Sequence, residues 1–387
     1  MVADRVIPVQ SEAADSAPNT QPRARDFHVD TWLHALGGLL SRHPSLCVRL
    51  GSLESRLIAD AIATVEVRAP IFVTGLARSG STILLEILDA HPATTAHRYS
   101  DYPLLYTPYW WNRFLQRAAT GPGQAVERSH HDGILITPDS PEAFEEVLWM
   151  TFFSQLHDPA RSAVLDAGTR NAEFESFYRD HIRKLLAVRG AQRYVSKGNY
   201  NITRLEYLLE LFPDARFVIP VRDPVWHVAS LMKQHALFCE QTRASPRALE
   251  HLRRIGHYEF GLDRRPINAG DDACLREILA HFQEGRDLQG WAQYWNHIYG
   301  YAMRLLESNA RVREATLVVR FEDLCADPRN VLQRLLDHCR LDSSNDFLEP
   351  AAARIRFPSY YKPPFTADER ELIEHYTADA RALAAGA

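Results

Sequence analysis

A glycine-rich segment between an apolar run and a helical pattern constrains the fold of this chain more than any other feature. Residues Gly75 to Thr82 read Gly-Leu-Ala-Arg-Ser-Gly-Ser-Thr; they follow the apolar run 71–73 and precede the apolar pattern of 83–88. The two glycines have the G-x-x-x-x-G spacing of a loop that wraps a phosphate group between a strand and a helix. The sequence therefore predicts a strand, an anion-binding loop and a helix N-terminus at this point.

The side chains of this loop indicate how it holds an anion. A nucleoside triphosphatase has Lys followed by Ser or Thr after the second glycine, whereas this chain has Ser81 and Thr82. The strong cation of the loop is Arg78, whose guanidinium can fork onto phosphate or sulfate oxygens while backbone N–H groups donate the remaining hydrogen bonds. We expect an anion held without a metal ion by Arg78, Ser79, Gly80, Ser81 and Thr82. The alternative is a plain strand-to-helix turn with a solvated arginine.

A second anion-binding pattern follows further along the chain. Residues 217–221 read as a buried strand, Asp223 as the N-cap of a helix and Pro224 as its first residue. Arg222 stands at the carboxyl end of this strand, and Ser230 follows eight residues later, about two helical turns along the same side of the helix. A guanidinium and a hydroxyl in these positions are suited to hold a second phosphate.

Four segments together resemble the sulfotransferases that use 3′-phosphoadenosine 5′-phosphosulfate (PAPS) as sulfuryl donor. The loop at Arg78 is similar to their R/K-S-G-T/S-T motif, and Arg222 with Ser230 is similar to their 3′-phosphate site. Residues 197–216 resemble the segment K-x-x-x-x-x-x-x-L-x-Y-L-x-x-L-F-P-x-A-K/R of the tyrosylprotein sulfotransferase branch. Residues 318–328 resemble the family's late strand and R-Y/F-E-D-L turn with a following D-P. The four segments stand in the family's order.

The resemblance implies a fold, a co-substrate and site residues. The implied fold is a P-loop-type, doubly wound parallel α/β sheet flanked by helices, with helical insertions. The implied reaction transfers a sulfuryl group from PAPS to a hydroxyl or amine acceptor and releases 3′,5′-bisphosphoadenosine (PAP), without a metal ion. Arg78 and Lys197 are the expected catalytic cations, since charge develops on the transferred group and the leaving oxygen. Thr82 is the expected donor to the 5′-phosphate, and Lys362 a candidate phosphate contact; the alternatives are a surface lysine at position 197 and a helix cap at Thr82.

The general base is the point at which the sequence departs from the family. The branch has a Glu several residues after Leu-Asp-Ala-His-Pro, which this chain has at 88–92, but no Glu occurs in 93–103. Asp101 is the nearest carboxylate and His97 the nearest imidazole, both after the expected second strand, where ligands bind in open α/β sheets. Asp101 is the predicted base, with His97 or a residue elsewhere as alternatives. A structural role for His97 stays open.

Aromatic side chains concentrate in two regions of the chain. Residues 102–111 contain five aromatics, which either line the acceptor pocket or pack in the core. The helical spacing of Trp291, Tyr294, Trp295 and Tyr299 favours core packing. Neither region identifies the acceptor, so the expected partner is a small molecule, a glycan, a lipid or a peptide.

Composition limits the classes of partner and the compartment. The chain has 387 residues and a formal net charge of −5, so no basic surface for nucleic acid is expected. Its five cysteines are odd in number and have no C-x-x-C pair, which argues against a disulfide framework and a zinc site. No apolar run approaches the roughly 20 residues that span a bilayer, and residues 1–10 have no signal-peptide pattern. We expect a cytoplasmic enzyme and leave its oligomeric state open.

The chain is expected to form one α/β domain after a disordered tail. Residues 1–26 are rich in Ala, Ser, Pro and charge, which favours disorder, and the domain is expected over 27–387. Segment 237–272 is predicted to be a helical insertion or a lid, and 353–365 a loop that covers the co-substrate. Periodicity predicts helices at 29–42 and 53–67, and strands starting at Ile71 and at about 93–97, 193–196, 216–221 and 316–320.

Two other functions stay open as alternatives. A P-loop kinase or NTPase needs Lys in place of Ser81 and a carboxylate at a strand end to hold magnesium, but this strand ends in Arg222. A catalytically inactive PAP- or PAPS-binding protein would keep Arg78 and Arg222 and lack a base.

Overall fold

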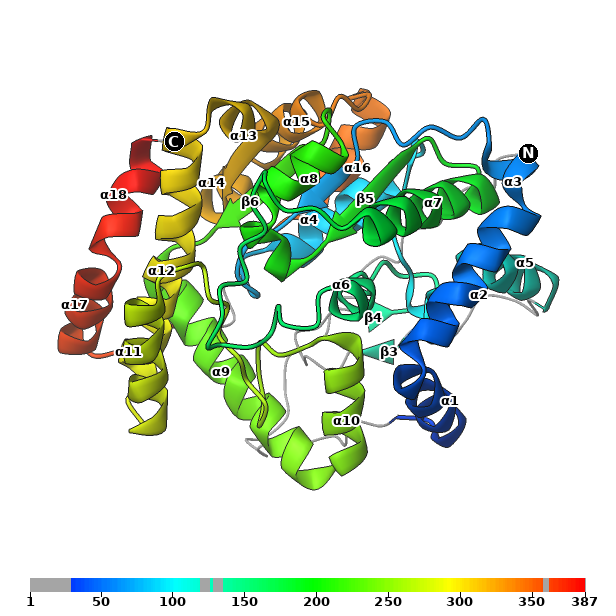
Figure 1. Ribbon diagram of the computed structural model, residues 1–387. Helices are drawn as coiled ribbons and strands as arrows, with labels where there is room; N and C mark the ends of the chain where they lie inside the picture. Colours follow the sequence, from blue (N-terminus) through cyan, green and yellow to red (C-terminus); the bar gives the residue numbers. More distant parts are fainter. Residues whose placement is uncertain (1–28, 119–125, 128–134, 358–361, 387) are drawn as a thin grey trace, which may run out of the picture.

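The structure is a computed structural model that describes residues 29–118, 126–127, 135–357 and 362–386 (Figure 1). The predicted disordered tail, 1–26, lies outside the described residues. The middle of the predicted covering loop, 358–361, also lies outside them.

Five parallel strands form the central sheet in the order β2, β5, β1, β6, β7. Their bounds are β1 (Ile71–Val73), β2 (Thr94–Thr95), β5 (Arg193–Lys197), β6 (Arg216–Val221) and β7 (Thr316–Arg320). The central strand is β1, where Phe72 stands opposite Ser196 of β5 and Phe217 of β6. All five predicted strands are present, and the predicted doubly wound parallel sheet is confirmed. A separate antiparallel pair consists of β3 (Val126–Glu127) and β4 (Leu135–Ile136).

Helices cover both faces of the sheet because its strands direct alternate apolar side chains into two cores. In β1, Ile71 and Val73 pack into one core and Phe72 into the other. The first core receives α4 (Ser81–Ala90), α14 (Phe321–Ala326), α15 (Pro328–His338) and α16 (Asn345–Ala353). The second receives α6 (Glu146–Phe152), α7 (Ala172–Arg189), α8 (Leu205–Leu211), α9 (Pro224–Ala244), α11 (Asp272–Gln283), α12 (Asp287–Ser308), α13 (Ala310–Ala315), α17 (Ala367–Tyr376) and α18 (Ala378–Gly386). The sheet is therefore the middle of three layers (Figure 1).

The N-terminal helices differ in part from the prediction. The first, α1 (Thr31–Arg42), matches the helix expected at 29–42. The helix expected at 53–67 has the wrong bounds, because α2 (Pro44–Leu57) begins earlier and α3 (Ala59–Ile62) follows it. Pro44 starts α2, since a residue in the first helical turn needs no backbone N–H.

Both α2 and α5 (Pro108–Ala118) pack on α7. A buried ion pair joins Glu54 of α2 to Lys184 of α7 at 3.1 Å. The carboxylate of Glu54 also accepts a hydrogen bond from the backbone N–H of Trp110 in α5, at 2.7 Å. The inner side of α2 is thus fixed by a charge pair, and its leucines at 53 and 57 point outward.

The predicted helical insertion, 237–272, contains the end of α9, α10 (Pro246–Ile255) and an irregular stretch. Helix α10 packs against α1, α6 and α9, so this region closes one side of the molecule (Figure 1). Whether it moves as a lid stays a prediction. The aromatic cluster of α12 is buried, as its helical spacing predicted.

Candidate active site

The loop after β1 makes a tight turn that depends on its glycines. The backbone φ angles of Gly75, Arg78 and Gly80 are 141°, 71° and 101°, all in the left-handed region. A Cβ on Gly80 would stand 2.6 Å from the ring of Phe321, so both conformation and space require glycine there. Gly80 is also the N-cap of α4 and has no side chain to cap it. The loop therefore leads into a bare helix N-terminus, which attracts anions.

Arg78, Ser81, Thr82 and Lys197 line one cavity of about 200 Å³. Lys197 is the last residue of β5, and the next residue, Gly198, donates its N–H to the carbonyl oxygen of Val73 at 3.0 Å. This bond fixes the end of β5 beside the loop after β1. The structure thus brings both predicted catalytic cations to the start of α4, where they would face an anion together with the helix dipole.

The predicted second phosphate site lies against the same loop. Ser230 Oγ accepts a hydrogen bond from Arg78 Nε at 3.3 Å, and Arg222 Nη1 donates to the carbonyl oxygen of Arg78 at 3.4 Å. The guanidinium of Arg222 also lies over the ring of Phe321, 5.0 Å from its centroid. Asp223 caps α9 through its side chain, as predicted. All four recognised segments therefore meet around the loop of Arg78, since Lys197 ends β5 beside it and the Phe321 ring lies against Arg222.

A buried histidine supports this turn from inside the protein. His227 Nε2 donates to the carbonyl oxygen of Ala77 at 2.8 Å, and His227 Nδ1 accepts from Trp295 Nε1 at 3.1 Å. Burial lowers the pKa of His227 to about 3, so the ring is neutral near pH 7 and has one donor and one acceptor for these two partners. Sequence analysis missed this residue. Its only signal was its place in the helix between Arg222 and Ser230.

A glutamate-rich segment closes the cavity near the loop. Glu142, Glu145 and Glu146 all line the cavity, but two of them are buried and engaged elsewhere. Glu145 accepts hydrogen bonds from the hydroxyls of α7 and β5, namely those of Tyr178, Tyr194 and Ser196. Glu146 pairs with both terminal nitrogens of Arg204, at 2.8 and 2.9 Å, and with His157 at 2.7 Å. Burial raises the pKa of Glu146, but Arg204 and His157 outweigh it and lower that pKa to about 2.

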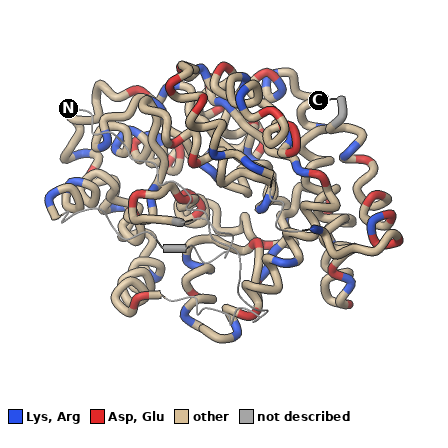
Figure 2. The backbone as a smooth tube through the Cα atoms, turned by 180° about the vertical axis from the view of Figure 1, so that it is seen from behind, with Lys and Arg blue, Asp and Glu red and all other residues tan. Residues whose placement is uncertain are grey.

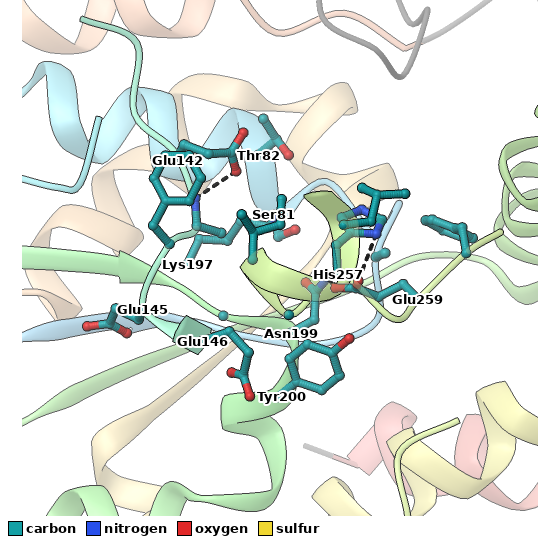
Figure 3. Close-up of a pocket in the computed structure, with 18 of the residues that line it drawn as sticks. Ser81, Thr82, Glu142, Glu145, Glu146, Lys197, Asn199, Tyr200, His257 and Glu259 are labelled. Carbon is teal, nitrogen blue, oxygen red and sulfur yellow. Dashed lines mark hydrogen bonds and ion pairs between the residues drawn. The ribbon is translucent and has the colours of Figure 1, made fainter. Parts of the chain in front are cut away.

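Glu142 is the remaining glutamate of this segment, and it is only half-buried. Figure 3 shows its carboxylate and the Lys197 side chain pointing toward one another beside Thr82, with Glu145 and Glu146 turned away from them. The backbone N–H of Glu142 donates to the carbonyl oxygen of His97 at 2.8 Å. Sequence analysis did not single out Glu142. The available signal was three glutamates within five residues at the start of a helix.

Comparison with protein families decides what kind of enzyme this site belongs to. A family model described as the sulfotransferase family matches residues 70–265, which is half of the chain. The chain belongs to the sulfotransferase family. It is an enzyme of that class, and this assignment holds over a kinase, an NTPase or an inactive binding protein.

Mycobacterial proteins are similar to this sulfotransferase along most of its length. The omega-hydroxy-beta-dihydromenaquinone-9 sulfotransferases Stf3 of Mycobacterium bovis and of Mycobacterium tuberculosis are each 22% identical over 333 residues, which cover 81% of this chain and 74% of the relative. Among solved structures, sulfotransferase STF1 of M. tuberculosis H37Rv is 17% identical, with coverage of 89% and 86% and a TM-score of 0.43. Sulfotransferase STF9 of Mycobacterium avium is 16% identical, with coverage of 84% and 80% and a TM-score of 0.47.

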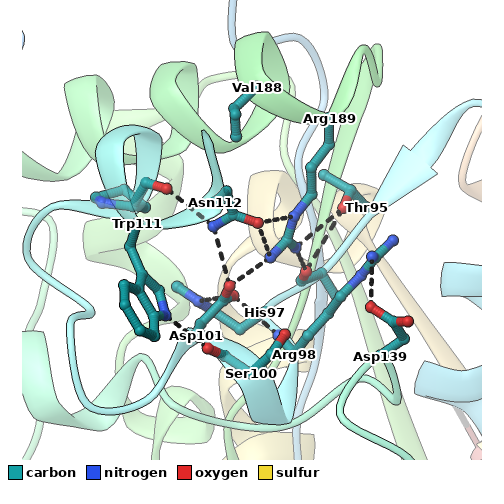
Figure 4. Close-up of polar contacts among 12 residues, drawn as sticks. Thr95, His97, Arg98, Ser100, Asp101, Trp111, Asn112, Asp139, Val188 and Arg189 are labelled. Carbon is teal, nitrogen blue, oxygen red and sulfur yellow. Dashed lines mark hydrogen bonds and ion pairs between the residues drawn. The ribbon is translucent and has the colours of Figure 1, made fainter. Parts of the chain in front are cut away.

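The predicted base Asp101 lies in a buried polar network (Figure 4). Its carboxylate accepts hydrogen bonds from Arg189 Nη2 at 2.5 Å, from Asn112 Nδ2 at 3.1 Å and from the backbone N–H of Arg98 at 2.9 Å. It also contacts His97 Nδ1 at 3.0 Å. Burial raises the pKa of Asp101, but Arg189 and His97 outweigh it and hold that pKa well below the ordinary value.

The structure argues against Asp101 and His97 as proton acceptors for a substrate. Neither residue lines the cavity, and their side chains are 1% and 2% exposed. The second nitrogen of His97 lies 2.9 Å from Nε2 of His181, so both nitrogens have protein partners. A carboxylate with so low a pKa is also a poor base. This geometry favours the structural alternative for His97, and the identity of the base stays a prediction.

The remaining sequence predictions have mixed outcomes. Lys362 is exposed and is not among the residues that line the cavity. Of the aromatics predicted as a pocket wall, Tyr102 lines the cavity, whereas Tyr106 is buried and Trp110 exposed.

Within the described residues there is no cluster of His, Cys, Asp or Glu that could hold a metal ion. In the same part of the chain, no helix has the length and apolar character to cross a membrane.

Proposed function

We propose that this sulfotransferase transfers the sulfuryl group of PAPS to the hydroxyl of an apolar acceptor, with Glu142 as general base. One observation carries the proposal: Arg78, Thr82, Lys197 and Glu142 all line the same cavity at the N-terminus of α4. This cavity therefore offers both the positive groups that a sulfuryl donor needs and a carboxylate that can take a proton.

On the donor side, the loop holds the 5′-phosphosulfate and Arg222 with Ser230 holds the 3′-phosphate. Ser79, Gly80, Ser81 and Thr82 supply backbone and hydroxyl donors at the helix N-terminus, where the dipole also favours negative charge. Ser230 and Arg222 both contact Arg78, which supports one continuous site for the two anionic ends of the donor. PAP is then the product, and no metal ion takes part.

In the proposed reaction, the acceptor oxygen forms a bond to sulfur while the bond between sulfur and the phosphate oxygen breaks. Negative charge grows on that leaving oxygen, where Arg78 and Lys197 stabilise it. The acceptor proton passes to the Glu142 carboxylate, toward which the Lys197 side chain points (Figure 3). The products are a sulfate ester, or a sulfamate if the acceptor is an amine, and PAP.

Lys362 enters the proposal as a contact made by the covering loop. The residue that precedes the undescribed part of this loop, Phe357, packs on Trp226 at 5.0 Å and on Phe321 at 6.3 Å between ring centroids. Phe321 is the ring that Arg222 covers. The loop thus begins next to the proposed 3′-phosphate site, which supports a role for Lys362 there.

The wall of the cavity supports an apolar acceptor. Aromatic and aliphatic side chains form a large part of the cavity wall, namely Leu33, Tyr99, Tyr102, Phe144, Tyr200, Phe238, Leu252, Ile255 and Phe260. Pockets of this character bury most of an apolar ligand and fix it with few polar contacts. The Stf3 relatives are named for a hydroxylated menaquinone, so a lipid or phenolic alcohol is the acceptor class that we propose. The five cysteines are free thiols, which fits a cytoplasmic location.

Two measurements test this proposal. PAP without magnesium should raise the unfolding temperature of the purified protein, because a ligand that binds only the folded state stabilises it, by about 2.7 kcal/mol at a hundredfold excess over Kd. A shift with magnesium and ATP but none with PAP would contradict the donor assignment. Incubation with radiolabelled PAPS should then label a long-chain or phenolic alcohol rather than a sugar or a peptide.

A further inference from the structure

Three helices on one side of the molecule expose an unusual amount of apolar surface. Ten large apolar side chains are exposed among the described residues, and eight of them belong to α1, α2 and α5. Their exposed fractions lie between 38% and 67%. We call this surface the α1–α2–α5 face; its members are Trp32, Leu39, Leu46, Leu50, Leu53, Leu57, Trp110 and Phe114.

The leucines of α2 form a stripe rather than a scatter. Leu46, Leu50, Leu53 and Leu57 follow one another at intervals of four, three and four residues, which places them along one side of the helix. The opposite side of α2 faces the protein interior. There Cys47, Val48 and Gly51 are buried, and α2 packs on α7. The stripe is therefore a second apolar side with no partner in the described part of the chain, and a contiguous patch of this kind marks an interaction surface.

The charge of the face is opposite to that of the whole protein. The three helices expose five arginines, Arg42, Arg49, Arg56, Arg113 and Arg117, and no exposed Asp or Glu. The whole chain has a net charge of −5, and Figure 2 shows acidic and basic residues interspersed over much of the backbone. A second copy of the face would bring these arginines against one another, with no exposed carboxylate from the three helices between them; the exposed Asp30 and Asp60 stand just outside the helices. An anionic surface complements the face.

The face adjoins the proposed acceptor cavity. Leu33 of α1 lines the cavity, while its neighbour Trp32 is exposed on the face. Helix α10 packs on α1 and supplies Leu252 and Ile255 to the cavity wall. Helix α1 thus contributes one side chain to the cavity wall and the next one to the exposed apolar surface.

We propose that the α1–α2–α5 face binds the surface of an anionic phospholipid membrane. Leucine, tryptophan and phenylalanine side chains enter the boundary between headgroups and acyl chains, and the flanking arginines contact lipid phosphates. The protein binds to one leaflet without crossing it. In that position α1 and the cavity behind it stand at the membrane, where an apolar acceptor would be dissolved. Binding itself does not depend on the identity of the acceptor or on sulfuryl transfer.

Flotation of the full chain with vesicles tests the proposal. The protein should float with vesicles of phosphatidylcholine and phosphatidylglycerol at about three to one, should float less with phosphatidylcholine alone, and should be released by salt. The double variant Leu46→Gln/Leu53→Gln should lower the partition coefficient by about tenfold or more, because two apolar side chains no longer enter the membrane. Leu262→Gln, at an exposed leucine outside the face, is the matched control and should bind as the unchanged protein does.

Other results would overturn the proposal. The proposal fails if the protein does not float with anionic vesicles, or if the double leucine variant floats as well as the control. It also fails if light scattering in the absence of lipid shows a dimer that Leu46→Gln/Leu53→Gln dissociates, because the face then belongs to a second copy. The substituted leucines are exposed, so thermal unfolding should show that both variants are folded. If PAP raises the unfolding temperature of both variants equally, the donor site is intact in both. A loss of vesicle binding is then independent of the proposed function.

Discussion

The backbone N–H of Glu142 donates a hydrogen bond of 2.8 Å to the carbonyl oxygen of His97. The side chain of His97 is in turn held between Asp101 and His181, and Asp101 is held by Arg189. A buried polar network therefore fixes the backbone that presents Glu142 to the cavity. We infer that Asp101 and His97 act by positioning, while Glu142 acts on the substrate.

Substitution of Glu142 tests the proposed base. Glu142→Gln keeps the shape of the side chain but cannot take a proton, so turnover should fall by roughly 10²–10⁴-fold, the usual contribution of a positioned base. PAP binding, followed by thermal shift, should stay close to that of the unchanged protein. Asp139→Asn is the matched control, because Asp139 belongs to the same segment and its side chain is 75% exposed. Near-normal turnover of Glu142→Gln would remove Glu142 from this role.

Substitution of Asp101 should affect stability more than chemistry. Asp101→Asn leaves Arg189 buried without its charge partner, and the loss of one partner from a buried ion pair costs about 3–5 kcal/mol in unfolding free energy. Urea unfolding measures this loss. Asp180→Asn is the control, because its pair with Arg183 is partly exposed and should contribute less than about 1 kcal/mol. If Asp101→Asn kept its stability and lost turnover at least as strongly as Glu142→Gln, the base would be Asp101 after all.

Local sequence signals made the loop, strand and helix start of the proposed donor side predictable. The strand, the glycines and the helix start around Arg78 lie within one short segment, and Arg222 with Ser230 lie within another. In each segment, the glycines, the N-cap residue and the apolar periodicity predict the local backbone conformation. Their meeting followed from a rule of topology, namely that the carboxyl ends of adjacent parallel strands lie at one edge of the sheet.

The acceptor side could not be predicted in the same way. Asp101 and Glu142 are both carboxylates near the second strand, and only tertiary contacts decide that the first is buried with Arg189 while the second reaches the cavity. The helix expected at 53–67 failed for a related reason. The inner side of α2 is set by the pairing of Glu54 with Lys184, which are 130 residues apart in the sequence.

Arg222 is expected to discriminate in favour of the 3′-phosphate. Arg222→Ala should weaken PAP binding by about 1.5–3 kcal/mol, the contribution of a charge-assisted hydrogen bond, and should weaken binding of adenosine 5′-phosphosulfate much less, because that ligand lacks the 3′-phosphate. Calorimetric titration of both ligands measures the difference. Arg216→Ala, at the opposite end of the same strand, is the control. Equal losses for the two ligands would show that Arg222 only supports the loop.

Gly80 is expected to tolerate no side chain. Gly80→Ala should lower the free energy of unfolding by about 1–3 kcal/mol from backbone strain, and more if Phe321 cannot move away from the new Cβ. PAP binding should fall as well, since the helix N-terminus would shift. Gly285→Ala is the control, because Gly285 also has a positive φ, of 72°, but nothing lies within 4 Å of a Cβ there. Equal effects of the two substitutions would show that contact with Phe321 is unimportant.

His227 should make the stability of the protein depend on pH. Its pKa is lowered to about 3 in the folded protein, chiefly by burial, from the value of 6.5 expected of an exposed histidine. Between these pH values the unfolded chain binds a proton that the folded chain does not, so this stabilisation is complete above pH 6.5 and is lost as the pH falls toward 3. His235 and His251 add to this loss, since burial lowers the pKa of each to about 4.

The contribution of His227 must therefore be read from a comparison with His227→Gln. The variant should be less stable near neutral pH, because Ala77 and Trp295 lose their fitted partner. Between pH 6.5 and 5, however, it should lose about 1.7 kcal/mol less than the unchanged protein, because the slope rises from half of its full value at pH 6.5 toward about 1.4 kcal/mol per pH unit for one proton. Urea unfolding at several pH values measures both slopes, and parallel slopes would mean that His227 takes up a proton without unfolding.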